Sequence, residues 1–136
     1  MLPLRHARRW QAASLCLLFL VLIGALMPAV WFWDDKVRGL AWIQSIDKWM
    51  HAVTFFVLTI WFAGQYRSKS YWRIALGLMA FGLVIEVCQR MVVYRTADWF
   101  DVGANTAGIA AGLLVAIAGV GGWCQHFEAR FTSDPT

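Results

Sequence analysis

The chain has 136 residues, which is enough for a single domain, residues 1–136. Hydrophobic residues make up 60% of it and nine residues are tryptophan, which excludes a disordered chain and argues against a water-soluble globular domain. The net charge is +4, but the basic residues form no face interleaved with aromatic residues, so we expect no nucleic-acid partner.

The first apolar segment extends from about residue 12 to residue 32 and follows an amino-terminal stretch with three arginines. A length of about 20 residues is enough to cross a hydrocarbon core of about 30 Å. The segment could also belong to a signal peptide, but no A-x-A cleavage pattern follows it. We therefore predict that it is a transmembrane helix.

Three further apolar segments follow, at about residues 47–64, 74–93 and 101–123. The second is short and crosses a membrane only if the helix begins near Ile46, whereas the fourth is rich in glycine and alanine. We expect the tail, residues 124–136, to be mobile. The predicted fold is all-α: a polytopic membrane protein built as a bundle of four transmembrane helices.

The distribution of charge predicts the orientation of this bundle. With four spans, both ends of the chain and the loop around residues 65–73 lie on one side, and this side holds the excess of Lys and Arg. The other side is slightly acidic. Because basic loops stay in the cytoplasm, we expect both termini to be cytoplasmic.

Polar residues interrupt the second and third apolar segments on the outward side. Asp47, Lys48 and His51 stand near the start of the second segment, and Glu86, Gln89 and Arg90 lie in the last third of the third. A carboxylate in a membrane segment costs roughly 2.5–3.5 kcal/mol unless it finds a partner, which makes such residues functional candidates. The alternative is structural: an acid can cap a helix, and an ion pair can simply hold two helices together.

The pattern continues with Arg95, Asp98, Asp101 and Asn105, at spacings of three, three and four residues. The two aspartates could act only as caps of the fourth helix. Gly108 and Gly112 form a GxxxG step, which is typical of close helix packing in membranes.

Known catalytic signatures are missing from the sequence, including G-x-S-x-G, HExxH and the Walker loop. A histidine with several carboxylates could bind a divalent metal, but the spacing matches no known pattern. We therefore predict neither a metal nor a cofactor.

The order and spacing of the polar residues resemble the VanZ-like family of bacterial membrane proteins. The resemblance covers about residues 30 to 115 and is carried by Asp47-Lys48-x-x-His51, Glu86-x-x-Gln89 and Arg95-x-x-Asp98-x-x-Asp101-x-x-x-Asn105-x-x-Gly108-x-x-x-Gly112. It implies a small multi-pass protein of the bacterial inner membrane, with the polar motif residues at the extracytoplasmic face. The family's namesake accompanies glycopeptide-resistance operons and is associated with low-level teicoplanin resistance.

The residues leave three functions open. The site could bind an envelope lipid or lipid-linked precursor, with its phosphate at Lys48, Arg90 and Arg95. It could instead belong to a membrane enzyme acting on the same class of substrate, with His51 and Glu86 as the catalytic acid–base residues. The third possibility is an accessory subunit that binds a second copy, or another membrane protein, through the Gly/Ala face of its last helix.

Overall fold

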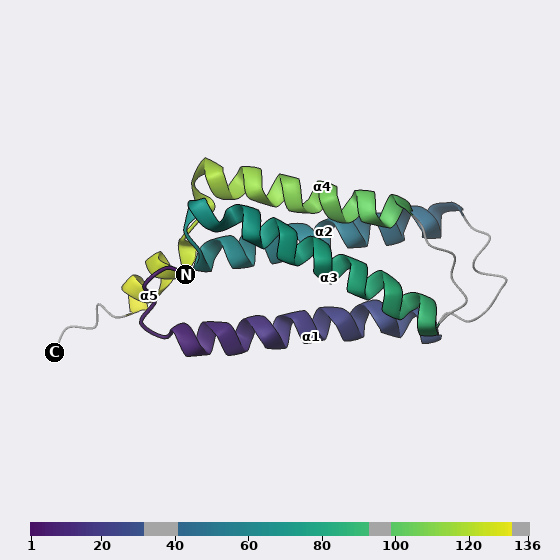
Figure 1. Ribbon diagram of the computed structural model, residues 1–136, viewed down its shortest axis with the longest axis horizontal. Coiled ribbons are helices and arrows are strands. Elements are labelled where there is room, and N and C mark those ends of the chain that lie inside the picture. Colours follow the sequence, from purple (N-terminus) through teal and green to yellow (C-terminus); the bar gives the residue numbers. More distant parts are fainter. Residues whose placement is uncertain (32–40, 93–98, 132–136) are drawn as a thin grey trace.

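The computed structural model describes the backbone of residues 1–31, 41–92 and 99–131, and the side chains of these residues except 27–31, 41–47 and 92. Within these ranges all regular secondary structure is helical (Figure 1), with five α-helices: α1 (Ala7–Trp31), α2 (Ala41–Gln65), α3 (Tyr71–Val92), α4 (Trp99–Val115) and α5 (Trp123–Phe131). A short 3₁₀ helix, Ser68–Ser70, precedes α3, and a π-helical turn, Ala116–Val120, follows α4.

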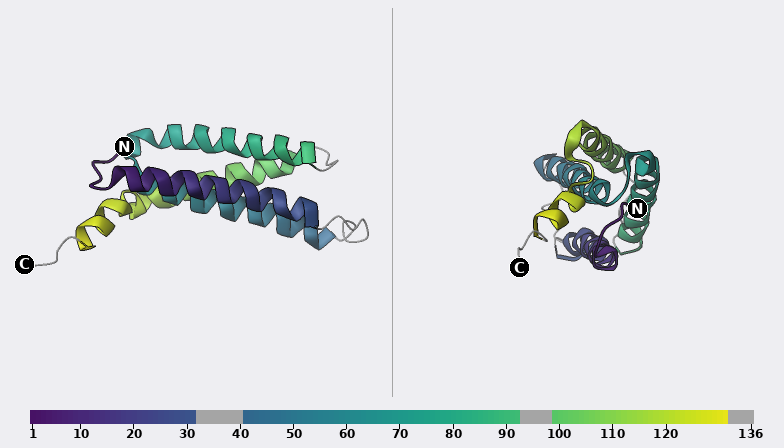
Figure 2. Two further views of the ribbon diagram at one scale, coloured as in Figure 1. Left: turned by 90° about the horizontal axis from the view of Figure 1, so that it is seen from below. Right: turned by 90° about the vertical axis from the view of Figure 1, so that its left-hand side faces the viewer.

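The four long helices lie side by side and alternate in direction, so that α2 and α4 run the same way (Figures 1 and 2). Helix α2 contacts α1, α3, α4 and α5, and its most extensive contact is with α4. Its inward side chains are the most deeply buried in the bundle: Phe55, Leu58, Thr59 and Ala63 are at most 1% exposed. The core is therefore built around α2.

Three helical stretches of the described chain are long and apolar enough to cross a membrane: Ala7–Leu26, Ser68–Met91 and Trp99–Val120. The sequence predicts four spans; α2, whose side chains are described only from Lys48 to Gln65, is not among these three, so the fourth span stays a prediction. Helix α2 is the long helix that its neighbours surround. Burial among them reduces the contact of its polar side chains with lipid.

The fourth predicted helix, residues 101–123, is not continuous in the structure. Helix α4 ends at Val115, and the chain then passes through the π-helical turn, in which Gly119 has φ 133°. Gly122 also has positive φ, at 77°, and its N–H donates to the carbonyl of Ala63 at 3.0 Å. Only glycine adopts such backbone angles readily, so these two residues end the helix before Trp123.

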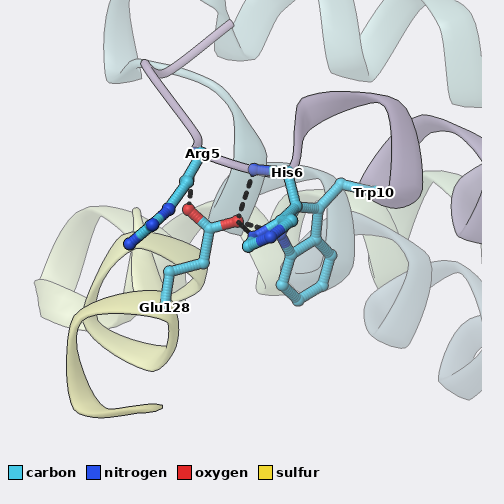
Figure 3. Close-up of polar contacts among 4 residues, drawn as sticks. All are labelled: Arg5, His6, Trp10 and Glu128. Atoms are coloured by element: carbon cyan, nitrogen blue, oxygen red, sulfur yellow. Dashed lines mark hydrogen bonds and ion pairs between the residues drawn. The ribbon is translucent and has the colours of Figure 1, made fainter. Parts of the chain in front are cut away.

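Most of the tail that the sequence predicts to be mobile, residues 124–136, forms helix α5 in the structure, which extends to Phe131. Glu128 of α5 accepts hydrogen bonds from the backbone N–H groups of Arg5 (2.8 Å) and His6 (3.0 Å) and from the indole N–H of Trp10 (2.9 Å), as Figure 3 shows. Arg5 and His6 directly precede α1, whose first N–H groups have no helical partner, so Glu128 acts as a cap supplied by another helix. The N-terminus and α5 therefore lie at the same end of the bundle (Figure 1).

Candidate functional site

Helices α2, α3 and α4 meet where the side chain of Asn105 lies over Gly82. A Cβ atom at Gly82 would lie 2.8 Å from Nδ2 of Asn105 and 3.1 Å from Cζ of Phe55. Asn105 is 5% exposed and Phe55 is 1% exposed. The absence of a side chain at Gly82 therefore provides the space that the Asn105 side chain of α4 and the Phe55 side chain of α2 occupy.

Three of the predicted site residues lie one turn from this contact, all toward the end of the bundle where α4 begins. They are His51, four residues before Phe55; Glu86, four residues after Gly82; and Asp101, four residues before Asn105. Four residues of helix advance by about 6 Å, and the alternating helix directions make all three steps point the same way. His51, Glu86 and Asp101 therefore share one level of the bundle.

The two acids at this level are buried, whereas the neighbouring cations lie at its edge. Asp101 is 1% exposed and Glu86 is 5% exposed. Nε of Arg90 lies 3.7 Å from Oε1 of Glu86, an ion pair between residues four apart on α3, and the Arg90 side chain remains 46% exposed. Nζ of Lys48 lies 4.5 Å from the centroid of the Phe100 ring, which holds this cation beside the first turn of α4.

Gln89 points to a different neighbour. Its Nε2 donates to the carbonyl of Ala25 in α1 at 3.0 Å, and the residue is 4% exposed. Gln89 therefore joins α3 to α1, although the sequence groups it with Glu86.

Two buried acceptors have no donor among the residues described: Oδ1 of Asn105 and Oε1 of Gln89. A buried acceptor without a donor costs about 1–3 kcal/mol. A molecule that brings a hydroxyl or amide N–H to Oδ1 of Asn105 would recover this free energy. Of these two residues, Asn105 is the one that lies one helical turn farther along the bundle from His51, Glu86 and Asp101.

Part of the predicted site lies outside the described residues, namely Arg95, Asp98 and the side chain of Asp47. In the part of the chain that is described, no group of three or more His, Cys, Asp or Glu side chains is arranged to hold a metal ion.

The GxxxG step packs against α2 of the same chain. A Cβ atom at Gly112 would lie 2.7 Å from Cβ of Thr59, and one at Gly108 would lie 3.0 Å from the carbonyl carbon of Ala52. The missing side chains bring α4 close to α2, and they set Asp101 and Asn105 against it. Gly108 and Gly112 thus serve helix packing within the chain, as the sequence predicts, and a partner on the rest of the Gly/Ala face stays a prediction.

A second polar cluster, which the sequence analysis missed, lies at the opposite end of the bundle. Oγ of Ser14 accepts from Nε1 of Trp61 (2.9 Å) and from Nε2 of Gln65 (3.0 Å), and it donates to the carbonyl of Trp10 (2.8 Å). Ser14 and Gln65 are 51 residues apart. The only sequence signal was a serine and a glutamine in or beside apolar segments, with nothing to pair them.

Two ionisable groups near this second cluster have shifted pKa values. Partial burial opposes ionisation of Glu128, but the hydrogen bonds from Arg5, Trp10 and His6 outweigh it and lower the pKa of Glu128. Burial, assisted by the nearby charge of Glu128, raises the pKa of Cys124 to about 12. The Cys124 thiol is therefore protonated at neutral pH and is not an active nucleophile.

A comparison with known families gives a match over most of the chain. Residues 4–120 match the family model described as VanZ/LLP1, a range that includes every predicted site residue. No curated protein and no solved structure matches the chain.

Proposed function

The chain belongs to the VanZ/LLP1 family, and on this basis we propose that it is a multi-pass protein of the bacterial inner membrane that binds the head group of an envelope lipid or lipid-linked precursor. The three long apolar helices support the membrane setting. Arg67, Lys69 and Arg73 lie at the same end as the N-terminus, which favours a cytoplasmic position for that end. The site around Glu86 then faces the extracytoplasmic side.

The observation that carries the proposal is the burial of Glu86 and Asp101 beside cations that remain accessible. The Glu86–Arg90 ion pair lies within α3 and joins no two helices, and the Arg90 side chain is 46% exposed while that of Glu86 is 7% exposed. Glu86 thus holds Arg90 at the edge of the site. A guanidinium in that position can bind a phosphate with two parallel hydrogen bonds.

The remaining polar groups suit the rest of such a head group. Lys48 adds a second cation from α2, and the two cations together match a phosphate or pyrophosphate. Asn105 offers its carboxamide oxygen to a hydroxyl or amide donor, as found on sugar head groups. Acids and cations in one site therefore fit a ligand that is both an anion and a hydrogen-bond donor.

The test is native mass spectrometry of the full-length protein in detergent, titrated with a long-chain polyprenyl phosphate and, separately, with the uncharged polyprenol. We expect the wild type to prefer the phosphate, and Lys48→Gln or Arg90→Gln to weaken its binding about tenfold, since a hydrogen bond to a charged group contributes about 1.5–3 kcal/mol. Arg67→Gln, which removes a cation at the other end, should bind like the wild type. Equal binding of phosphate and alcohol by the wild type would rule the proposal out.

A second candidate function is catalysis on the same class of lipid. It is favoured by the common level of His51 and Glu86, which places a possible base and a possible acid on facing helices. In that case His51→Ala should abolish turnover of the lipid while leaving its affinity unchanged. A structural role as an accessory subunit instead predicts that His51→Ala lowers the yield of folded protein.

A contribution to teicoplanin resistance is a further consequence to test. We expect bacteria that express the wild type to be less susceptible to teicoplanin than bacteria that express the Arg90→Gln variant at the same level. Equal susceptibility would separate this protein's activity from resistance.

A further inference from the structure

A cleft of about 320 Å³ lies between α1, α2 and α3, toward the end of the bundle that holds the N-terminus. Its walls are apolar: Leu18 comes from α1, Phe62 from α2, and Leu78 and Phe81 from α3. Gly77 of α3 also lines it, and a Cβ atom there would meet nothing within 4 Å. The absence of a side chain at Gly77 therefore adds to the space.

One end of this cleft is polar, and its polar groups can all donate hydrogen bonds. They belong to Tyr66, Ser70 and Arg73. Among the described residues, none of these three side chains has a hydrogen-bonding or carboxylate partner, and the guanidinium of Arg73 lies 5.2 Å from the centroid of the exposed Trp72 ring. A cation beside two hydroxyl groups at the mouth of an apolar cleft is complementary to an anion that carries a hydrocarbon chain.

The depth of the polar end matches the position of lipid head groups. The candidate span of α3 begins at Ser68 and continues to Met91, so Ser70 and Arg73 lie in its first turns, while Leu78 and Phe81 lie deeper. Trp72 is 59% exposed at the same level, as aromatic residues at a membrane interface commonly are.

We propose that this cleft binds one acyl chain of an anionic phospholipid from the surrounding leaflet, with the lipid phosphate at Arg73. A cavity of about 150 Å³ is large enough for benzene, so the cleft has room for a chain of roughly a dozen carbon atoms and not for a whole diacyl lipid. The second chain then lies outside, against the apolar surface of the bundle. This site is at the opposite end from Glu86 and does not depend on the function proposed there.

The experiment is native mass spectrometry of the full-length protein in detergent, titrated in parallel with phosphatidylglycerol and phosphatidylcholine. We expect one tightly bound phosphatidylglycerol and weaker binding of the zwitterionic lipid. Arg73→Gln should lower the affinity for phosphatidylglycerol about tenfold, because a charge-assisted hydrogen bond is lost. It should lower the affinity for phosphatidylcholine less, because the choline cation of that lipid at the same time loses an unfavourable positive neighbour. Gly77→Leu fills the cleft and should abolish the tight binding of either lipid.

Each variant has a matched control. Arg67→Gln removes a cation from the same end but not from the cleft, and Gly103→Leu adds the same side chain on α4, where a Cβ atom also meets nothing within 4 Å. Both controls should bind phosphatidylglycerol like the wild type. Arg90→Gln should do so too, which separates this site from the one at the other end.

The proposal is overturned if the wild type binds the two lipids equally, or if Arg73→Gln has no more effect than Arg67→Gln. It is also overturned if folded Gly77→Leu binds as well as Gly103→Leu. Size-exclusion chromatography and circular dichroism establish that each variant is folded, and if Gly77→Leu is not, the comparison of the two arginine variants decides the question.

Discussion

Replacing Gly112 with alanine adds a methyl group to the contact between α4 and α2. The new Cβ would lie 2.7 Å from Cβ of Thr59, 2.9 Å from its Cγ2 and 3.0 Å from the carbonyl oxygen of Phe56. Carbon atoms in contact lie about 3.5–4.0 Å apart, so α4 has to move away from α2 by about 1 Å. Thr59 cannot turn aside, because it is fully buried and its hydroxyl donates to the carbonyl of Phe55 at 2.7 Å.

Two opposing terms decide the effect on stability. Overpacking of this kind costs about 1–3 kcal/mol, while Gly→Ala within a helix gains up to about 1 kcal/mol. Gly103→Ala on the same helix isolates the gain, since nothing lies within 4 Å of a Cβ atom there. We expect the free energy of unfolding of Gly112→Ala to be lower than that of Gly103→Ala by about 1–3 kcal/mol.

The assay is the loss of helical circular dichroism as SDS is added to the detergent-solubilised protein. If both alanine variants unfold at the same SDS fraction, α4 does not approach α2 as closely as the structure has it. A larger loss for Gly112→Ala would support the contact that sets Asp101 and Asn105 against α2.

Three further substitutions test the ends of the bundle and the centre of the site. Hydrogen bonding outweighs burial and lowers the pKa of Glu128, so the contribution of its carboxylate to stability is present above the ordinary pKa of 4.5 and is lost as the pH falls through the lowered value. Tryptophan fluorescence between pH 7 and pH 3 should therefore show an acid transition that Glu128→Gln lacks. An identical titration of the two proteins would refute this prediction. Ser14→Ala removes the hydroxyl that accepts from two donors, an indole and a carboxamide N–H, and should lower the free energy of unfolding by about 1–3 kcal/mol in the SDS assay. Thr106→Ala, the control, removes an exposed hydroxyl that bonds within its own helix and should change the free energy of unfolding little. Gly82→Ala puts a methyl group 2.8 Å from Nδ2 of Asn105, so we expect weaker binding of the polyprenyl phosphate with the cations intact; unchanged binding would exclude Asn105 from the site.

The sequence correctly predicts the helical class of the fold. Glu86, Asp101 and Asn105 are buried, as expected for polar residues that recur at helical intervals within apolar segments. Periodicity of this kind depends on neighbours three or four residues apart, so it can be read along one helix. For the same reason the GxxxG step could be recognised as a packing face before its neighbour was known.

The sequence could not predict which helices these faces meet. The contact of Glu128 with Arg5 joins residues that are 123 positions apart in the sequence. That His51, Glu86 and Asp101 lie at the same height along the bundle depends on the relative axial positions of α2, α3 and α4. Gln89 shares a helical turn with Glu86 but hydrogen-bonds to α1. Such partners are set by the packing of the whole bundle.

The amino-acid sequence by itself therefore determined the all-helical class, the long apolar segments and the polar positions within them, because each depends on local composition and helical period. Only the tertiary structure decided that α2 lies at the centre, that α4 stops at Val115, and that α5 caps α1. These features arise from contacts between distant segments, where the approach of one backbone to another at residues such as Gly82 and Gly112 fixes which side chains can meet.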